Sequence, residues 1–431
     1  MQKSLLVLGR QPELGLAELE SLFGTDKVTL FGDNLAVLDV DPKDVPYSRL
    51  GGSVKLCKML HEFKTTNWLE IDEHLKKVFP DHIKNIEGKL TFGISTINIQ
   101  VSAKQQQKTG LELKKIAKKS GVSARVVPNK TKELNSASVL HNKLYKNNGW
   151  ELLFVSDGES IMFGQTVGVQ DIDAYAARDQ QRPKRDSRVG MLPPKLAQII
   201  INLATGELPE QKDDTESFDQ KINEKVIKRS DALRILNKEV VATKSEIVET
   251  PKQTILDPFC GTGVLLQEAL LMGYNTFGTD IEFEMIQYTH ENLDWLQSRF
   301  RVKGTYDVTP GDATEFDWKS GFDFVASETY LGKAYSHAPR SDELHKNIQN
   351  VNTITKKFLS NLAKQTEKDT RICLALPAWK TKDGFLHLGV LDSLGEIGYN
   401  RMEFKSSGGK ELIYHREGQQ VGRELVVIIR K

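Results

Sequence analysis

"DPFCGTG", residues 257–263, lies between an apolar run, Thr254 to Leu256, and a segment, 264–270, with the composition of a helix. In an alternating α/β protein this order places the turn at the carboxyl end of a strand, where ligands bind against the exposed amides of the next helix. Two glycines in the turn permit tight backbone angles and close approach of a ligand. Strands and helices keep alternating from Thr254 onward, which predicts a mostly parallel sheet with helices on both faces.

The residues of the turn discriminate between three classes of cofactor. A phosphate-binding P-loop needs a Gly-Lys-Ser/Thr ending, which this turn lacks. A dinucleotide fingerprint needs a third glycine where Leu266 stands, and Asp257, directly before the turn, would repel a pyrophosphate. The same carboxylate would attract a positively charged sulfonium. We therefore predict S-adenosylmethionine as the cofactor.

Two further carboxylates fit this cofactor. Asp280 ends the next strand-like run, roughly 20 residues beyond the glycines, where a carboxylate can accept from both ribose hydroxyls. Asp312 follows another short strand and can accept from the adenine amino group. The predicted cofactor-binding residues are Asp257, Phe259, Gly261, Gly263, Asp280, Ile281, Asp312 and Ala313.

Composition limits the remaining possibilities. A chain of 431 residues exceeds one ordinary core, so we expect two or three domains. A net charge of +1 gives no global field for nucleic acid or membrane. Cys57, Cys260 and Cys373 are far apart, which argues against a disulfide framework and against a metal site. With no signal-peptide core and no apolar run of about 18 residues, we expect a soluble cytoplasmic protein with no membrane partner.

Two segments of the chain are locally basic, although the net charge of the whole chain is close to zero. Residues 101–130 carry eight Lys or Arg side chains against one acid, Glu112, and a solvated helix face and a phosphate-tracking surface both fit this pattern. Residues 166–190 carry a second cluster, interleaved with acids around Pro183. The RNA-binding candidates are Lys114, Lys115, Lys118, Lys119, Arg178, Arg182, Lys184 and Arg185.

Three longer stretches, with the glycine turn, indicate a family. They are AYAARDQQRPKRDSRVGMLPPKLAQIIINLA at 174–204, LNSASVLHNKL at 134–144 and VGVQDIDAY at 167–175. The chain resembles the THUMP-domain tRNA guanine-N2 methyltransferases of class I, which use S-adenosylmethionine. The resemblance implies guanosine 10 of tRNA as the substrate and, as for some relatives, a small activating protein subunit.

The resemblance also implies a domain order. Residues 1–65 would form an N-terminal ferredoxin-like α+β domain, 66–165 a THUMP RNA-binding domain and 166–190 a linker. Residues 191–431 would form a Rossmann-like methyltransferase domain. Within that domain, the charge-dense stretch 206–250 reads as a solvent-facing insertion.

The catalytic loop departs from the family. Relatives carry Asp/Asn-Pro-Pro-Tyr after the fourth strand, where the acid or amide accepts from the exocyclic amine and the ring stacks on the base. Here the loop reads Ser-Glu-Thr-Tyr-Leu-Gly at 327–332, so that Glu328 replaces the acid, Thr329 and Tyr330 the prolines, and Leu331 the aromatic ring. A carboxylate within about 3 Å can still orient the amine, and Tyr330 can stack on an extruded base. We predict Glu328, Thr329 and Tyr330 as catalytic residues.

Several alternatives remain open at this point. A DNA amino-methyltransferase would use a similar loop, although no DNA-reading helix is evident. A tRNA-binding scaffold without turnover would explain the altered loop. Cys260 as a nucleophile is disfavoured, because the turn needs small residues and has no histidine nearby. The sequence does not distinguish monomethylation from dimethylation.

Overall fold

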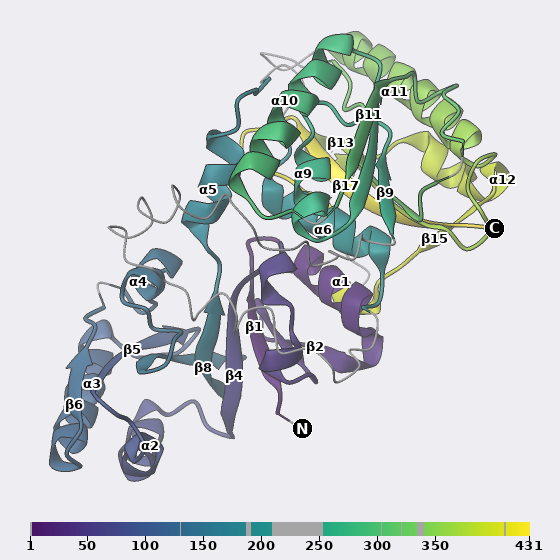
Figure 1. Ribbon diagram of the computed structural model, residues 1–431. Helices are drawn as coiled ribbons and strands as arrows, with labels where there is room; N and C mark the ends of the chain where they lie inside the picture. Colours follow the sequence, from purple (N-terminus) through teal and green to yellow (C-terminus); the bar gives the residue numbers. More distant parts are fainter. Residues whose placement is uncertain are drawn as a thin grey trace, which may run out of the picture.

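The computed structural model describes residues 2–129, 131–186, 191–208, 253–302, 304–319, 321–333, 340–408 and 411–431. It contains two β-sheets, each in a lobe of its own (Figure 1). The N-terminal lobe holds the smaller sheet, and the C-terminal lobe begins with helix α6, Pro194–Thr205.

The N-terminal sheet has eight strands in the order β2-β3-β1-β4-β8-β7-β5-β6. Most neighbours are antiparallel, and only β5 runs parallel to its partners β6 and β7. Helices α1, Pro12–Phe23, α2, Trp68–Ile83, α3, Ala103–Lys119, and α4, Ser136–His141, accompany it. The strands are β1 Ser4–Leu8, β2 Val28–Phe31, β3 Leu35–Leu38, β4 Ser53–Phe63, β5 Lys89–Ile97, β6 Ser123–Val126, β7 Gly149–Ser156 and β8 Ile161–Val169.

One continuous sheet thus joins both α+β units expected from the sequence. Antiparallel pairing of β4 with β8 connects them. Where β4 passes between the units, Lys55 is buried and forms an ion pair with Glu151 at 2.8 Å. Ser95 and Thr166 also donate to Glu151, so this buried carboxylate is held by partners from three strands. The assignment of residues 66–165 to the THUMP family stays a prediction.

The C-terminal sheet follows the order β11-β10-β9-β12-β13-β17-β15, with β14 beside β13 and β16 beside β17. The first five strands of this order are parallel, β17 is antiparallel to β13, and β15 is antiparallel to β17 and so runs in the same direction as the first five. The expected mostly parallel, Rossmann-like α/β architecture is confirmed. Its elements are β9 Thr254–Asp257, α9 Val264–Leu271, β10 Asn275–Asp280, α10 Phe283–Arg299, β11 Tyr306–Pro310, β12 Phe324–Glu328, α11 Ser341–Leu362, β13 Arg371–Thr381, β14 Gly384–Leu386, α12 Leu394–Ile397, β15 Tyr399–Met402, β16 Ile413–Tyr414 and β17 Val421–Arg430.

The strand order creates a switch point between β9 and β12. The chain runs from β9 outward through β10 to β11, then returns to the other side of β9 as β12. At such a point the loops that follow adjacent strands diverge to opposite faces, which opens a crevice beyond the carboxyl ends of the strands. The glycine turn follows β9 and the Ser-Glu-Thr-Tyr motif spans the end of β12, so both predicted motifs lie at this crevice.

Helix α1 packs against α6 and so couples the two lobes. Leu14 and Ala17 share one apolar cluster with the residues of α6. The neighbouring Glu18 is fully buried, and it accepts from the side-chain amide of Asn202 at 2.7 Å and from the backbone N–H of Gly51 and Gly52. Burial raises the pKa of Glu18 to about 7. The lobes are thus joined by a mixed apolar and hydrogen-bonded contact.

The predicted linker is partly regular structure. Strand β8 extends to Val169, and helix α5, Ile172–Gln180, follows it. Residues 187–190 of the linker and residues 209–250 of the expected insertion lie outside the described residues. No helix in the described part of the chain combines the length and the apolar character that crossing a bilayer requires.

Candidate active site

A cavity of about 700 Å³ lies at the switch point of the C-terminal sheet. Its walls come from the loops after β9, β10, β11 and β12 and from one side of α11. It contains all three predicted catalytic residues and seven of the eight predicted cofactor-binding residues, namely Asp257, Phe259, Gly261, Asp280, Ile281, Asp312 and Ala313.

Asp257 is the most deeply placed carboxylate of the cavity. It is the last residue of β9 and only 2% exposed. Its Oδ1 accepts from the Ser327 hydroxyl at 2.6 Å and from the Phe259 backbone N–H at 3.3 Å, which leaves Oδ2 for a ligand in the cavity. Burial, with smaller repulsions from Asp280 and Glu328, raises the pKa of Asp257 to about 7. A cationic ligand would compensate for this buried negative charge.

Asp280 links the second strand to the glycine turn. One of its oxygens accepts from the Gly261 backbone N–H at 2.9 Å and the other from the Glu282 N–H at 3.0 Å. Burial raises its pKa, while these two hydrogen bonds oppose the shift. A carboxylate has about four acceptor positions, so both oxygens can still accept from hydroxyl groups. The geometry suits the predicted contact with a ribose diol.

Asp312, after β11, and Ile281, after β10, add a carboxylate and an apolar side chain to the cavity wall. Asp312 Oδ1 accepts from the backbone N–H and the hydroxyl of Thr314, both at 2.8 Å, so that Oδ2 stays available. Ile281 also lines the cavity and is 68% exposed. An apolar side chain beside a hydrogen-bond acceptor is a suitable arrangement for a flat heterocycle that carries an amino group.

Gly263 is the one predicted cofactor-binding residue outside the cavity lining. It has a φ of +80°, and a Cβ placed there would lie 2.8 Å from Cγ2 of Thr289 on α10. The Thr289 hydroxyl in turn donates to the Gly261 carbonyl at 2.7 Å. Glycine is therefore needed at 263 for the left-handed turn and for the close packing of α10, and we no longer propose a ligand contact for it.

Glu328 is ion-paired, which the sequence did not predict. It ends β12, its side chain is 13% exposed, and its Oε1 accepts from Nε of Arg423 on β17. Arg423 is itself 7% exposed at the side chain. Burial raises the pKa of Glu328, and the adjacent guanidinium partly opposes this rise. Arg423 therefore favours the ionised carboxylate and leaves Oε2 for a substrate.

The two residues after Glu328 differ in role. The backbone N–H and hydroxyl of Thr329 both donate to the Ala375 carbonyl, at 3.1 and 3.4 Å, and the residue is 4% exposed. Thr329 thus fixes the loop to β13 while it lines the cavity, and its predicted catalytic role stays a prediction. Tyr330 is 41% exposed at the cavity wall, where its ring is free to meet a base.

Sequence reasoning missed Arg423 and the contribution of α11. Arg423 and Glu424 directly precede an apolar run, Leu425 to Ile429, and two adjacent charges beside such a run indicate buried partners, so a signal was present. Asn350, Thr353 and Lys357 of α11 line the cavity opposite the glycine turn, and no motif marks them. Burial raises the pKa of Cys260 well above its usual range, which disfavours a thiolate nucleophile.

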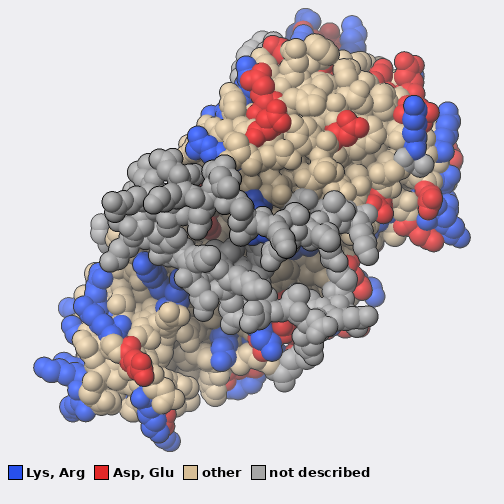
Figure 2. All heavy atoms as spheres, in the orientation of Figure 1, with Lys and Arg blue, Asp and Glu red and all other residues tan. Residues whose placement is uncertain are grey.

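The predicted basic surface on α3 is exposed. Lys114, Lys115, Lys118 and Lys119 all point to solvent, while Leu113 and Ala117 are buried beneath the helix. Figure 2 shows Lys and Arg side chains gathered at this end of the N-terminal lobe. The arrangement suits a polyanion that lies across the lobe.

The linker cations are mostly engaged within the protein. Arg178 pairs with the buried Glu268 at 2.9 Å, and Arg182 is 3% exposed and donates to the Thr262 hydroxyl at 3.2 Å. These contacts remove Arg178 and Arg182 from the proposed RNA-binding set. Lys184 is half-buried and lies 3.4 Å from a Glu291 carboxylate oxygen, whereas Arg185 is exposed.

Comparison with known families identifies the C-terminal half. Residues 249–397 match a family model described as "Methyltransferase domain". The match, the strand order of the C-terminal sheet and the cavity at its switch point all indicate a methyltransferase domain. The C-terminal half is a methyltransferase domain of Rossmann-like fold, and its cofactor is S-adenosylmethionine.

Two curated relatives match parts of the chain. The tRNA (guanine(10)-N2)-dimethyltransferase of Methanothermobacter thermautotrophicus is 30% identical over 123 residues, which cover 28% of this chain and 32% of the relative. The enzyme of the same description from Pyrococcus abyssi is 38% identical over 96 residues, which cover 21% of this chain and 27% of the relative. The chain thus matches about a third or less of each relative's length. TrmN from Thermus thermophilus superimposes with a TM-score of 0.48 at 11% identity, covering 100% of both chains.

Proposed function

We propose that the protein is a tRNA methyltransferase that transfers the methyl group of S-adenosylmethionine to the N2 amine of a guanosine, at position 10. One observation carries the proposal. Glu328 and Tyr330, at the end of β12, line the same cavity as Asp257, at the end of the adjacent β9. A carboxylate acceptor and an exposed ring therefore lie beside the predicted place of the sulfonium.

The residues of the cavity divide the work of the reaction. The bound cofactor supplies an electrophilic methyl group on a positively charged sulfur. Asp257 offers its free oxygen to that charge, and Asp280 and Asp312 hold the nucleoside part. Glu328 Oε2 accepts from the exocyclic amine, which directs the nitrogen lone pair toward the methyl group and holds it there. After transfer the nitrogen carries a positive charge, and the same carboxylate can receive the proton that it loses.

The exposed ring of Tyr330 supports the proposal that the substrate is a nucleic-acid base. An aryl amine in a nucleic acid reaches such a cavity only when its nucleotide is turned out of the stack, and the extruded base then needs a flat partner. The choice of tRNA and of guanosine 10 is supported by the printed activity of the two curated relatives. The exposed lysines of α3 fit the backbone contacts of a folded RNA.

A methyl-transfer assay with nucleoside mass spectrometry tests the proposal. Purified protein and labelled cofactor would be incubated with an unmodified tRNA transcript, with its guanosine-10-to-adenosine variant and with DNA. N2-methylguanosine or N2,N2-dimethylguanosine in the first reaction alone is the expected result. Methylated adenine or cytosine in DNA would instead identify an amino-methyltransferase of DNA. RNA binding without product, even after a cell extract is added to supply an activating subunit, would indicate a scaffold.

The α3 lysines give a prediction about affinity. Replacing Lys114, Lys115 and Lys118 together with glutamine should weaken tRNA binding and reduce the dependence of log K on log salt concentration by about 2, since each neutralised phosphate contributes roughly 0.7–0.9 to that slope. Filter binding between low and moderate salt measures it. The control replaces three exposed lysines distant from α3, Lys27, Lys368 and Lys382. An equal change in both variants would mean that only net charge matters.

A further inference from the structure

Helix α11 and the turn after it carry exposed lysines that none of the motifs above includes. Lys346 and Lys357 are spaced by eleven residues, which puts them within about 20° of one another around a helix of 3.6 residues per turn, and Lys364 lies in the turn just after the last helical residue, Leu362. Lys356 directly precedes Lys357 and lies about 100° from it around the helix. All four side chains are exposed, and among the described residues none of the four has an ion-pair partner. The four lysines thus form a strip of uncompensated positive charge along the methyltransferase domain.

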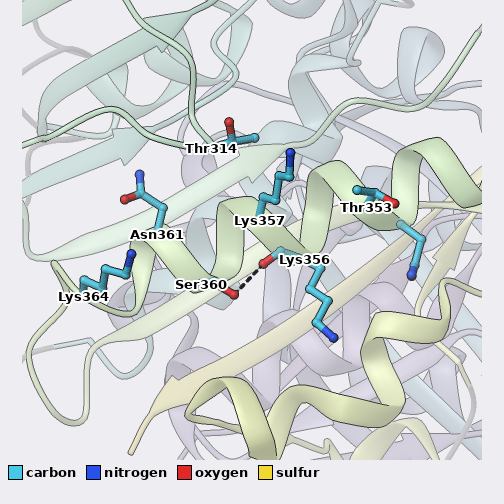
Figure 3. A pocket seen from close by; sticks show the side chains of 8 residues that line it. Thr314, Thr353, Lys356, Lys357, Ser360, Asn361 and Lys364 are labelled. Atoms are coloured by element: carbon cyan, nitrogen blue, oxygen red, sulfur yellow. Dashed lines mark hydrogen bonds between the residues drawn. The ribbon is translucent and has the colours of Figure 1, made fainter.

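A shallow hollow of about 440 Å³ lies along this strip. Its walls offer only neutral or positive polar groups and no carboxylate, as Figure 3 shows. Lys356 and Lys357 extend away from each other, and Lys364 stands beside Asn361 one turn further on. The lining residues are Thr314, Asn352, Thr353, Lys356, Lys357, Ser360, Asn361 and Lys364.

The hollow adjoins the cofactor cavity. Thr314, Thr353 and Lys357 line both. A long ligand with one residue in the cavity could therefore extend along α11 without crossing an acidic surface. A small anion would be held weakly here, because the lysines are solvated and surface pairs contribute little. A polyanion gains at every lysine through the release of its condensed counterions.

We propose that the lysines of α11 and of the turn after it, Lys346, Lys356, Lys357 and Lys364, bind phosphates of the RNA backbone next to the active site. The proposal rests on the proposed function for the identity of the ligand as RNA. From Lys346 to Lys357 the helix rises about 16 Å, so these lysines can contact more than one phosphate of a strand. These contacts carry no sequence information and fix the register of the RNA on the domain. The α3 lysines and the α11 lysines would then hold the same molecule from two lobes.

The test uses the full chain with Lys356→Glu and Lys364→Glu, which leave the cavity-lining Lys357 intact. The matched control is Lys368→Glu with Lys382→Glu, two exposed lysines of the same domain outside the hollow. Binding of an unmodified tRNA transcript would be measured across salt concentrations, together with cofactor affinity and the KM and kcat of methyl transfer.

We expect the α11 variant to bind tRNA at least tenfold more weakly than the control at low salt. The slope of log K against log salt concentration should become shallower by about 1.5. The KM for tRNA should rise to match, with kcat within about twofold and cofactor affinity unchanged. Equal affinity and slope in the α11 variant and its control would overturn the proposal, and an acidic protein would then be the occupant to consider. If the unaltered protein binds tRNA without methylating it, the proposed function fails while the binding comparison still decides this surface.

Discussion

The change Glu328→Ala is expected to lower kcat by about 10²–10⁴-fold, the usual contribution of one positioned acid or base. The reason is geometric: Glu328 Oε2 is the carboxylate oxygen that the β12 loop offers to a substrate, since Oε1 is held by Arg423. Cofactor affinity should stay within about threefold, because the deepest carboxylate of the cofactor side, Asp257, is unchanged. Single-turnover methyl transfer and calorimetry with S-adenosylmethionine measure the two quantities.

The control must separate lost catalysis from lost stability. Removing Glu328 leaves the guanidinium of Arg423 buried without its partner, which costs about 3–5 kcal/mol of folding free energy. The double variant Glu328→Ala with Arg423→Leu removes both charges, and its thermal stability should recover toward that of the unaltered protein. Turnover should stay low in this variant. If turnover returned together with stability, Glu328 would be a structural residue.

Local patterns in the sequence predicted the cofactor half of the site well. Asp257 and Asp280 each end a strand and Asp312 follows one, and parallel strands bring such ends to a single edge of the sheet. Strand, turn and helix succeed one another within a few residues, so the sequence alone carries the information. Ile281, directly after Asp280, lies at the cavity for the same reason.

Contacts between distant segments could not be predicted in this way. The Arg423–Glu328 pair depends on β17 folding back antiparallel beside β13, a register set by packing over the whole sheet. Arg182 lies in a basic stretch that looks solvent-facing, yet its side chain is buried against Thr262. Charge patterns show which residues carry charge, and only the fold determines which of them point inward.

The Asp257 carboxylate gives the last prediction, a pH-dependent affinity for the cofactor. Its pKa in the unliganded protein is about 7, raised mainly by burial, so below pH 7 the group is protonated. A sulfonium favours the ionised form, and binding must then release a proton. Affinity for S-adenosylmethionine should therefore rise up to about tenfold per pH unit between pH 5.5 and 7 and level off above, as calorimetry in buffers of different ionisation enthalpy would show.

Two controls assign this titration to Asp257 and to the charge on sulfur. Asp280 and Glu328 also face the cavity with raised pKa values, and Arg423 opposes the rise at Glu328. Asp257→Asn keeps an acceptor for Ser327 but cannot ionise. It should lower affinity above pH 7 by about 2–5 kcal/mol, roughly 30-fold to several thousand-fold, and remove the pH dependence. S-adenosylhomocysteine has a neutral sulfur, so its affinity for the unaltered protein should change little with pH. An equal slope for both ligands would place Asp257 at the amino group that they share and not at the sulfur.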